Sequence, residues 1–213
     1  MPVKVLHIQS KLSRNVQHLE HLEHLEPPAT MLNRVLGFLL LIILSPLFLV
    51  IGMLILLEDG APVFFKQKRF GKDATFFWLY KFRSMKKNTP NVATHLLTHP
   101  EKYLLKTGKW LRKLSFDELP NLVNIVRGEM AFVGPRPALY NQDDLMELRR
   151  AAGVDKLKPG ITGWAQVNGR DELSLEQKVG YEKEYLHRKS LPFDFKIILL
   201  TFFHSATSKG VSH

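Results

Sequence analysis

An apolar run from Val35 to Leu57 constrains the fold of this chain more than any other feature. About 23 residues pass there without a charge, and about 20 suffice for a helix that crosses a bilayer. A helix in the core of a soluble domain is rarely apolar over such a length. The run lies too far from Met1 for a signal peptide, and Glu58-Asp59-Gly60 is no small-residue cleavage site. The sequence therefore predicts a membrane helix.

Ser45-Pro46 lies near the middle of this run and predicts a break in the helix. Pro46 removes one backbone hydrogen bond and its ring collides with the Ile42 carbonyl, while the Ser45 hydroxyl can donate to the Leu41 carbonyl. Each half has about 11 residues, or about 17 Å, too short for a hydrocarbon layer of about 30 Å. Two paths stay open, a kinked span and a re-entrant helical hairpin. Basic residues at both ends favour the re-entrant form: Arg34 before the run, and Lys66, Lys68, Arg69 and Lys72 after it.

Two adjacent carboxylates, Asp117 and Glu118, stand out in a chain of formal net charge +10. With Arg112 close by, a pair of acids among cations suggests a site for phosphate, a metal ion or both. Ser115 and Glu118 fit a capping box, whereas a helix that begins at Pro120 would place the acids in the turn before it. In a capping box the acids could have a purely structural role, so both interpretations stay open here.

The composition excludes some chemistry and indicates a class of partner. Without cysteine, the chain forms no disulfide, Cys-ligated zinc site or thiol nucleophile. The sequence pI of about 9.8 implies anionic partners, among them nucleic acids, acidic lipid headgroups and phosphorylated substrates. No nucleic-acid-binding motif is recognisable, so we expect no nucleic acid partner.

The remaining pattern predicts an α+β fold that is mostly helical. Residues 1–30, with three His-Leu-Glu copies, are typical of a poorly ordered, low-complexity extension, although the histidine spacing leaves metal binding open. Strands are expected at Val63–Gln67 and Thr75–Phe82, joined by a turn at Gly71–Ala74. Helical segments are expected at Glu101–Leu114, Asp143–Gly153 (exposed and charged), Ser174–Lys189 and Leu191–Phe203, the last along a membrane surface or packed on the domain. His95 and His99 lack the metalloprotease pattern.

Arg136 lies between two prolines, which hold the backbone around it extended. An arginine fixed in this way suits bidentate binding of phosphate. Further along, the Gly-rich stretch from Lys158 to Arg170 permits close backbone approach to a ligand, and Gln166 and Arg170 offer side-chain donors. Neither a Walker loop nor a Rossmann fingerprint occurs in the sequence.

Taken together, these motifs resemble the bacterial sugar transferase family, in particular the small monotopic phosphoglycosyl transferases. The matching stretches are Ser45-Pro46, Arg69-Phe70-Gly71-Lys72, Tyr80-Lys81-Phe82-Arg83-Ser84-Met85, Leu114-Ser115-Phe116-Asp117-Glu118-Leu119-Pro120, Val133-Gly134-Pro135-Arg136-Pro137 and residues 159–170. The resemblance covers roughly residues 31–213. It implies an N-terminal extension (1–30), a re-entrant membrane helix broken at Ser45-Pro46 (31–60), and a small cytoplasmic catalytic domain with a short β-hairpin and interfacial helices (61–213).

The resemblance also implies a reaction. A sugar-1-phosphate would pass from a UDP-sugar to undecaprenyl or another polyprenyl phosphate, with Mg²⁺ and release of UMP, as the first membrane step of polysaccharide or glycoconjugate assembly. Asp117 would be the nucleophile that forms an aspartyl phospho-sugar, and Glu118 would help to hold Mg²⁺. The expected location is the cytoplasmic face of the bacterial inner membrane, in contact with lipids; a homodimer stays open. Candidates for binding phosphate or nucleotide are Arg112, Arg136, Lys81, Arg83, Gln166 and Arg170.

One alternative of a different class explains the positive charge and the apolar run equally well. A non-enzymatic, basic membrane adaptor in polysaccharide export would bind acidic lipid or an export partner. That hypothesis gives no reason for the Asp117-Glu118 pair or for the proline-flanked Arg136. UMP release from a UDP-sugar distinguishes the enzyme from the adaptor.

Overall fold

The computed structural model describes residues 28–89, 99–169 and 172–207. The chain divides into two compact units, Met1–Leu32 and Asn33–His213, and the fold described below is that of the second. The elements in chain order are α2 (Pro28–Asp59), β1 (Phe64–Phe70), η1 (Lys72–Ala74), β2 (Phe76–Phe82), η3 (Pro100–Tyr103), α3 (Lys106–Lys113), η4 (Phe116–Glu118), α4 (Asn121–Val126), β3 (Ala131–Val133), α5 (Asp143–Ala151), η5 (Val154–Lys156), β4 (Gly160–Thr162), α6 (Trp164–Val167), α7 (Leu175–Arg188) and α8 (Leu191–Thr207). The predictions for the His-Leu-Glu copies, His95 and Arg170 fall outside the described residues.

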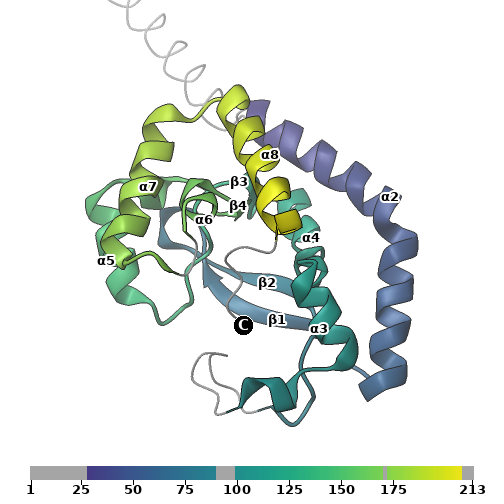
Figure 1. Ribbon diagram of the computed structural model, residues 1–213. Coiled ribbons are helices and arrows are strands. Elements are labelled where there is room, and N and C mark those ends of the chain that lie inside the picture. Colours follow the sequence, from purple (N-terminus) through teal and green to yellow (C-terminus); the bar gives the residue numbers. More distant parts are fainter. Residues whose placement is uncertain (1–27, 90–98, 170–171, 208–213) are drawn as a thin grey trace, which may run out of the picture. The chain divides into compact units, whose positions relative to one another are not determined.

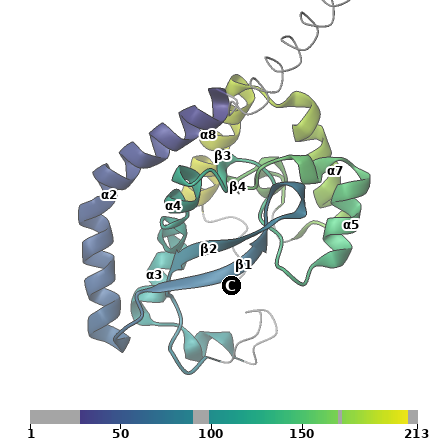
Figure 2. The same ribbon diagram turned by 180° about the vertical axis from the view of Figure 1, so that it is seen from behind.

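Helix α2 contains the predicted apolar run as one continuous helix. The most apolar 18-residue stretch within Ala29–Asp59 has a mean hydropathy of 3.0, and by length and composition the helix could cross a membrane. Pro46 lies inside the helix, which changes direction along its length in both views (Figures 1 and 2). The Ser45 hydroxyl donates to the Ile42 carbonyl at 2.8 Å, not to Leu41 as predicted. Ile42 is the residue whose carbonyl Pro46 cannot bond, so the serine replaces the missing donor and the predicted break is a bend.

The predicted β-hairpin is confirmed, with β1 beginning one residue later and ending three residues later than expected. β1 and β2 pair antiparallel from Phe64 opposite Phe82 to Phe70 opposite Phe76. Since side chains alternate between the two faces of a strand, Phe77 and Leu79 share one face, and there they pack against Leu122 of α4. This face also carries Lys81, so the core contact holds Lys81 beside the start of α4.

A buried amide joins β2 to α4. The side chain of Asn124 is inaccessible to solvent; its Oδ1 accepts from the Tyr80 N–H at 3.2 Å and its Nδ2 donates to the Trp78 carbonyl at 2.7 Å. Backbone groups at the edge of a sheet need such partners when they are buried. Asn124 of α4 therefore supplies β2 with the hydrogen bonds that a third strand would supply in a larger sheet.

A second, two-stranded sheet was not predicted. β3 and β4 run parallel, with Ala131 opposite Gly160 and Val133 opposite Thr162. A Cβ on Gly160 would lie 2.1 Å from the Gly134 nitrogen, and one on Gly163 would lie 2.1 Å from the Gly134 oxygen. Glycine is thus required for this close packing, which brings the Gly-rich stretch against the segment that leads to Arg136.

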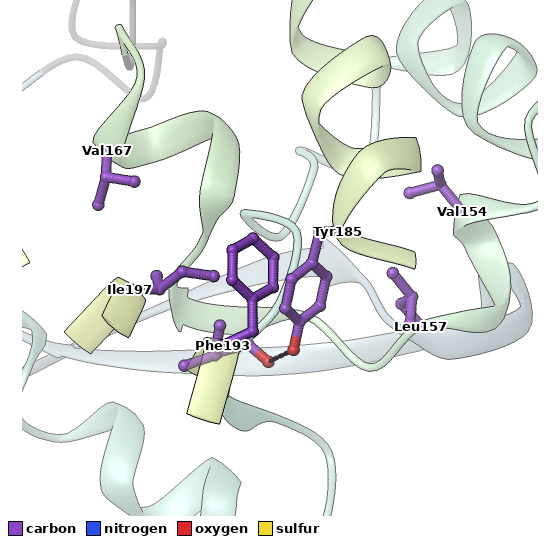
Figure 3. Close-up of a cluster of buried hydrophobic side chains, with 7 residues drawn as sticks. Val154, Leu157, Val167, Tyr185, Phe193 and Ile197 are labelled. Carbon is purple, nitrogen blue, oxygen red and sulfur yellow. Dashed lines mark hydrogen bonds between the residues drawn. The ribbon is translucent and has the colours of Figure 1, made fainter. Parts of the chain in front are cut away.

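The C-terminal helices enclose a separate apolar cluster that includes Val154, Tyr185, Phe193 and Ile197 (Figure 3). The Tyr185 hydroxyl donates to Asp194 Oδ1 at 2.7 Å, so its burial leaves no donor unsatisfied. Helix α7 begins with a complete capping box, in agreement with the polar helix predicted there.

Helix α5 was predicted to be exposed, and that prediction is wrong for one of its faces. Leu145, Met146 and Arg149 are buried. Arg149 Nε donates to Glu182 Oε2 of α7 at 2.8 Å, and its Nη2 donates to the Arg136 carbonyl at 2.9 Å. A buried ion pair between two helices cannot be recognised from the charge pattern of one of them.

Candidate active site

The two adjacent acids lie in η4, the turn between α3 and α4. Ser115 has φ 57° and makes no side-chain capping bond, so the capping-box interpretation is wrong. Helix α4 begins at Asn121 with Pro120 before it, which is the alternative in which the acids precede the helix. In this left-handed conformation Ser115 does not act as a helix cap.

Glu118 is the centre of an ion triad. Its Oε1 lies 2.7 Å from Lys81 Nζ and 3.2 Å from Arg136 Nη2. Burial raises the pKa of the Glu118 carboxyl, but the charges and hydrogen bonds of Lys81 and Arg136 outweigh it and hold this pKa well below its usual value. Glu118 therefore stays ionised, and it fixes the positions of two cations that come from β2 and from the loop after β3.

The environment of Asp117 has the opposite effect on its ionisation. Burial raises the pKa of the Asp117 carboxyl, and the negative charge of Glu118 adds to this. Lys81 and Arg112 lower the pKa, but the net direction is upward. Arg112 is held by a hydrogen bond from its Nε to Ser84 Oγ at 3.0 Å. Two neighbouring acids thus differ in environment, one stabilised as an anion and the other poorly solvated, which is typical of an acid with a chemical role.

Arg69 belongs to this site and was not among the predicted binding residues. Its Nη1 donates to the Pro137 carbonyl at 2.9 Å and its Nη2 to Gln67 Oε1 at 2.6 Å. Burial, together with the nearby Arg136, lowers the pKa of Arg69 to about 10. The signal was present in the sequence, in the Arg69-Phe70-Gly71-Lys72 stretch, but there Arg69 was interpreted only as a basic flank of the apolar run.

Arg69, Lys81, Glu118, Asn121 and Arg136 line one small cavity. Within the described part of the chain, two buried atoms of its lining have no hydrogen-bond partner: Arg69 Nε, a donor, and Asn121 Oδ1, an acceptor. Unpaired buried polar groups are uncommon in folded proteins and often mark a binding site. Three cations around one acid leave a net positive charge that suits phosphate oxygens.

Arg83 is not part of the site, and the prediction that it binds phosphate is corrected. Its side chain is buried and donates to the Asp59 carboxylate, to the Gly60 carbonyl at 2.5 Å and, through Nε, to the Pro62 carbonyl at 2.7 Å. All three guanidinium nitrogens therefore bind the end of α2 and the segment after it. Lys81, two residues earlier on the same strand, points to Glu118 instead.

Gln166 lies away from the acidic pair, in a second cavity that also includes Arg136. The amide nitrogen of Gln166 donates to the Ile161 carbonyl at 3.0 Å. The structure thus brings Asp117, Glu118, Lys81 and Arg136 together, with Arg112 close to Asp117, and separates Gln166 from them. Arg170 lies outside the described residues.

The residues present fit Mg²⁺ only if the ion is shared with a substrate. In the described ranges, no group of three or more His, Cys, Asp or Glu side chains could hold a metal ion. Mg²⁺ is commonly bound by one or two carboxylates together with substrate phosphates and water, rather than by a cage of protein ligands. Asp117 and Glu118 offer that number of carboxylates.

Comparison with known proteins adds to this geometry. Residues 28–208 match the model of the family described as Bacterial sugar transferase. The chain is 37% identical over 183 residues to the UDP-glucose:undecaprenyl-phosphate glucose-1-phosphate transferase of Escherichia coli (strain K12), a match that covers 83% of this chain and 39% of that protein. It is 43% identical over 155 residues to the uncharacterized sugar transferase EpsL of Bacillus subtilis, covering 73% and 75%. With the exopolysaccharide production protein ExoY of Rhizobium meliloti it shares 36% identity over 187 residues, covering 80% and 81%.

Proposed function

This chain belongs to the bacterial sugar transferase family, and from that membership and the site around Asp117 we propose that it is a phosphoglycosyl transferase. It moves a sugar-1-phosphate from a UDP-sugar to undecaprenyl or a similar polyprenyl phosphate and releases UMP. The name of the Escherichia coli relative assigns that protein UDP-glucose as donor and undecaprenyl phosphate as acceptor. The observation that carries the proposal is the poorly solvated Asp117 beside cations held in place by Glu118.

The cations bind the phosphates of donor and acceptor. Phosphoryl transfer depends on neutralisation of charge and on alignment more than on a strong base. Lys81 and Arg136 already share Glu118 Oε1, so their positions are set before a substrate arrives. Arg69 and Arg112 add two further guanidinium groups, both held by hydrogen bonds. Such preorganisation lowers the cost of reorienting charges during the reaction.

Asp117 takes part in two displacements, as the nucleophile in the first and as the leaving group in the second. In the first, a carboxylate oxygen of Asp117 bonds to the phosphorus next to the sugar; the bond from that phosphorus to the bridging oxygen breaks, and UMP leaves with the electron pair. In the second, an oxygen of the polyprenyl phosphate bonds to the same phosphorus and the carboxylate leaves. Division into two steps is the advantage of covalent catalysis. Burial keeps water from solvating the Asp117 carboxylate, which favours its attack on phosphorus.

Asp117 and Glu118 would hold Mg²⁺ together with phosphate groups of the substrate. When bound, the ion would neutralise charge that develops on the diphosphate. Lys81 and Arg136 both bind Oε1 of Glu118, so Oε2 would be the oxygen that faces the ion.

We further propose that α2 is re-entrant, with both of its ends on the cytoplasmic face of the inner membrane. Near one end, Arg34 Nε donates to the Val126 carbonyl at 2.9 Å, at the end of α4. At the other end, Glu58 Oε2 accepts from Thr107 Oγ1 at 2.6 Å, at the start of α3. A helix that is hydrogen-bonded at both ends to one domain cannot place these ends on opposite sides of a bilayer.

A UMP-release assay tests the function. Membranes that contain the chain, supplied with a UDP-sugar, Mg²⁺ and undecaprenyl phosphate, should release UMP, and Asp117→Asn should abolish release. Release of UDP would indicate simple glycosyl transfer, and lipid binding without UMP would indicate the adaptor. Without acceptor, one equivalent of UMP and a phospho-sugar adduct on Asp117 are expected. If Asp117→Asn releases UMP at the wild-type rate, Asp117 is not the nucleophile.

A further inference from the structure

A second cavity shares one lining residue, Arg136, with the small cavity around Glu118. It is partly open to solvent and is lined by Arg136, Trp164, Gln166 and Lys178 among others. Arg136 also donates to Glu118 at 3.2 Å. One guanidinium group therefore borders both the ion triad and the second cavity. A ligand with its phosphates at the ion triad can extend one end into the second cavity.

Gln166 presents a fixed acceptor in this cavity. Because its Nε2 donates to the Ile161 carbonyl at 3.0 Å, the amide is oriented with Oε1 as the remaining group. Oε1 is buried and has no hydrogen-bond partner in the part of the chain that the structure describes. A buried acceptor without a donor is unfavourable, and a ligand N–H would satisfy it.

Trp164 supplies an aromatic wall whose orientation is fixed on two sides. Its Nε1 donates to Glu184 Oε2 at 2.8 Å, and its ring lies 5.1 Å from that of Phe193, centroid to centroid. Aromatic side chains of this kind bind the flat face of a nucleobase. An aromatic wall, a lone acceptor and a neighbouring phosphate site together match a nucleotide whose base carries a ring N–H.

We propose that this cavity takes the uracil of the donor, with the N3–H of the base donating to Gln166 Oε1. The inference rests on the proposed function and deepens it, since it assigns Gln166 to recognition of the base and not to phosphate. Cytosine has an acceptor at N3 and would face Oε1 with a lone pair. A site built to bond one N–H rejects an analogue that lacks it, so Gln166 selects uridine nucleotides.

Calorimetric titration of the full chain in detergent tests the assignment without turnover. The probes are UMP, 3-methyl-UMP, which lacks the N3–H, and CMP. The wild type should bind UMP about tenfold or more tightly than either analogue. Gln166→Met should bind UMP as weakly as 3-methyl-UMP while its affinity for 3-methyl-UMP stays unchanged, which also shows that the fold is intact.

Gln177→Met is the matched control, because Gln177 makes only an exposed capping bond at the start of α7 and should keep the wild-type preference. Equal binding of UMP and 3-methyl-UMP by the wild type overturns the proposal, as does a retained preference in Gln166→Met. Weaker UDP-sugar binding with unchanged UMP binding in Gln166→Met assigns the cavity to the sugar and also overturns it. In all of these cases UMP release can persist, so the subsite can fail while the proposed function stands.

Discussion

Removing the charge of Lys81 or of Glu118 should move the ionisation of Asp117 in opposite directions. Lys81 lowers the pKa of Asp117, whereas Glu118 raises it. Lys81→Met should therefore raise this pKa and Glu118→Gln should lower it. The nucleophile must be ionised, so the acid limb of the pH–rate profile should move to higher pH in Lys81→Met and to lower pH in Glu118→Gln.

The contacts within the triad increase both shifts. Lys81 Nζ lies 2.7 Å from Glu118 Oε1, so each partially screens the charge of the other at Asp117. Loss of Lys81 exposes Asp117 to the full charge of Glu118, and loss of Glu118 exposes it to unscreened cations. A charge about 4–6 Å away moves a carboxyl pKa by about 1–3 units, and the partial exposure of the site favours the lower figure. A shift of about one unit corresponds to about 1.4 kcal/mol and a tenfold change in rate on the acid limb.

The measurement is kcat/KM for UMP release between about pH 4 and pH 8, since this ratio reports ionisations of the free enzyme. Both variants should lose activity at every pH because both groups contact the phosphate site, but that loss changes the plateau and not the position of the limb. Lys109→Met, at an exposed position of α3, is the matched control and should leave the limb in place. If both variants move the limb in the same direction, or neither does, Asp117 is not the titrating group.

Three further predictions concern stability and topology. Asp117→Asn should raise the thermal unfolding midpoint while abolishing UMP release, because it removes a carboxylate whose burial disfavours its charge; a lower midpoint contradicts this. Arg149→Met should lower the free energy of unfolding, measured with denaturant, by about 3–5 kcal/mol by leaving Glu182 buried and unpaired, and adding Glu182→Gln should recover most of the loss. As the chain has no cysteine, Thr30→Cys and Ala61→Cys permit single-site labelling, and a membrane-impermeant thiol reagent should reach both from one side.

The sequence predicted those elements whose signals are local. The apolar run, the two strands of the hairpin and the polar helix that begins near Ser174 all depend on residues close together in the chain, and each matches the structure. The Ser115–Glu118 pair has the same spacing as the Ser174–Gln177 pair that caps α7, yet it forms no cap. Ser115 is left-handed in the turn between α3 and α4, so the tertiary structure overrides the local preference there.

The site was predicted where a motif was chemically unusual and missed where the partners lie far apart in sequence. Asp117 and Glu118 were identified because they are adjacent acids, and Arg136 was identified because prolines flank it. Arg83 looked equivalent to Lys81, since both are cations near the end of β2 and two residues apart. The difference is in their partners, because Lys81 meets Glu118, 37 residues ahead, and Arg83 meets Asp59, 24 residues behind. No pattern within a strand contains that information.

The corrected role of Arg83 explains how the depth of the reaction site is set. Arg83 binds the end of α2, and Lys81 binds Glu118, so two residues at the end of β2, about 6.6 Å apart, connect the apolar helix with the acidic pair. Near the other end of α2, Arg34 binds the last turn of α4, the helix that begins just after that pair. A single-span anchor with a flexible linker would let the site move relative to the headgroups. Attachment of α2 through both the end of β2 and α4 would hold the site at one height, as the proposed lipid-borne phosphate acceptor requires.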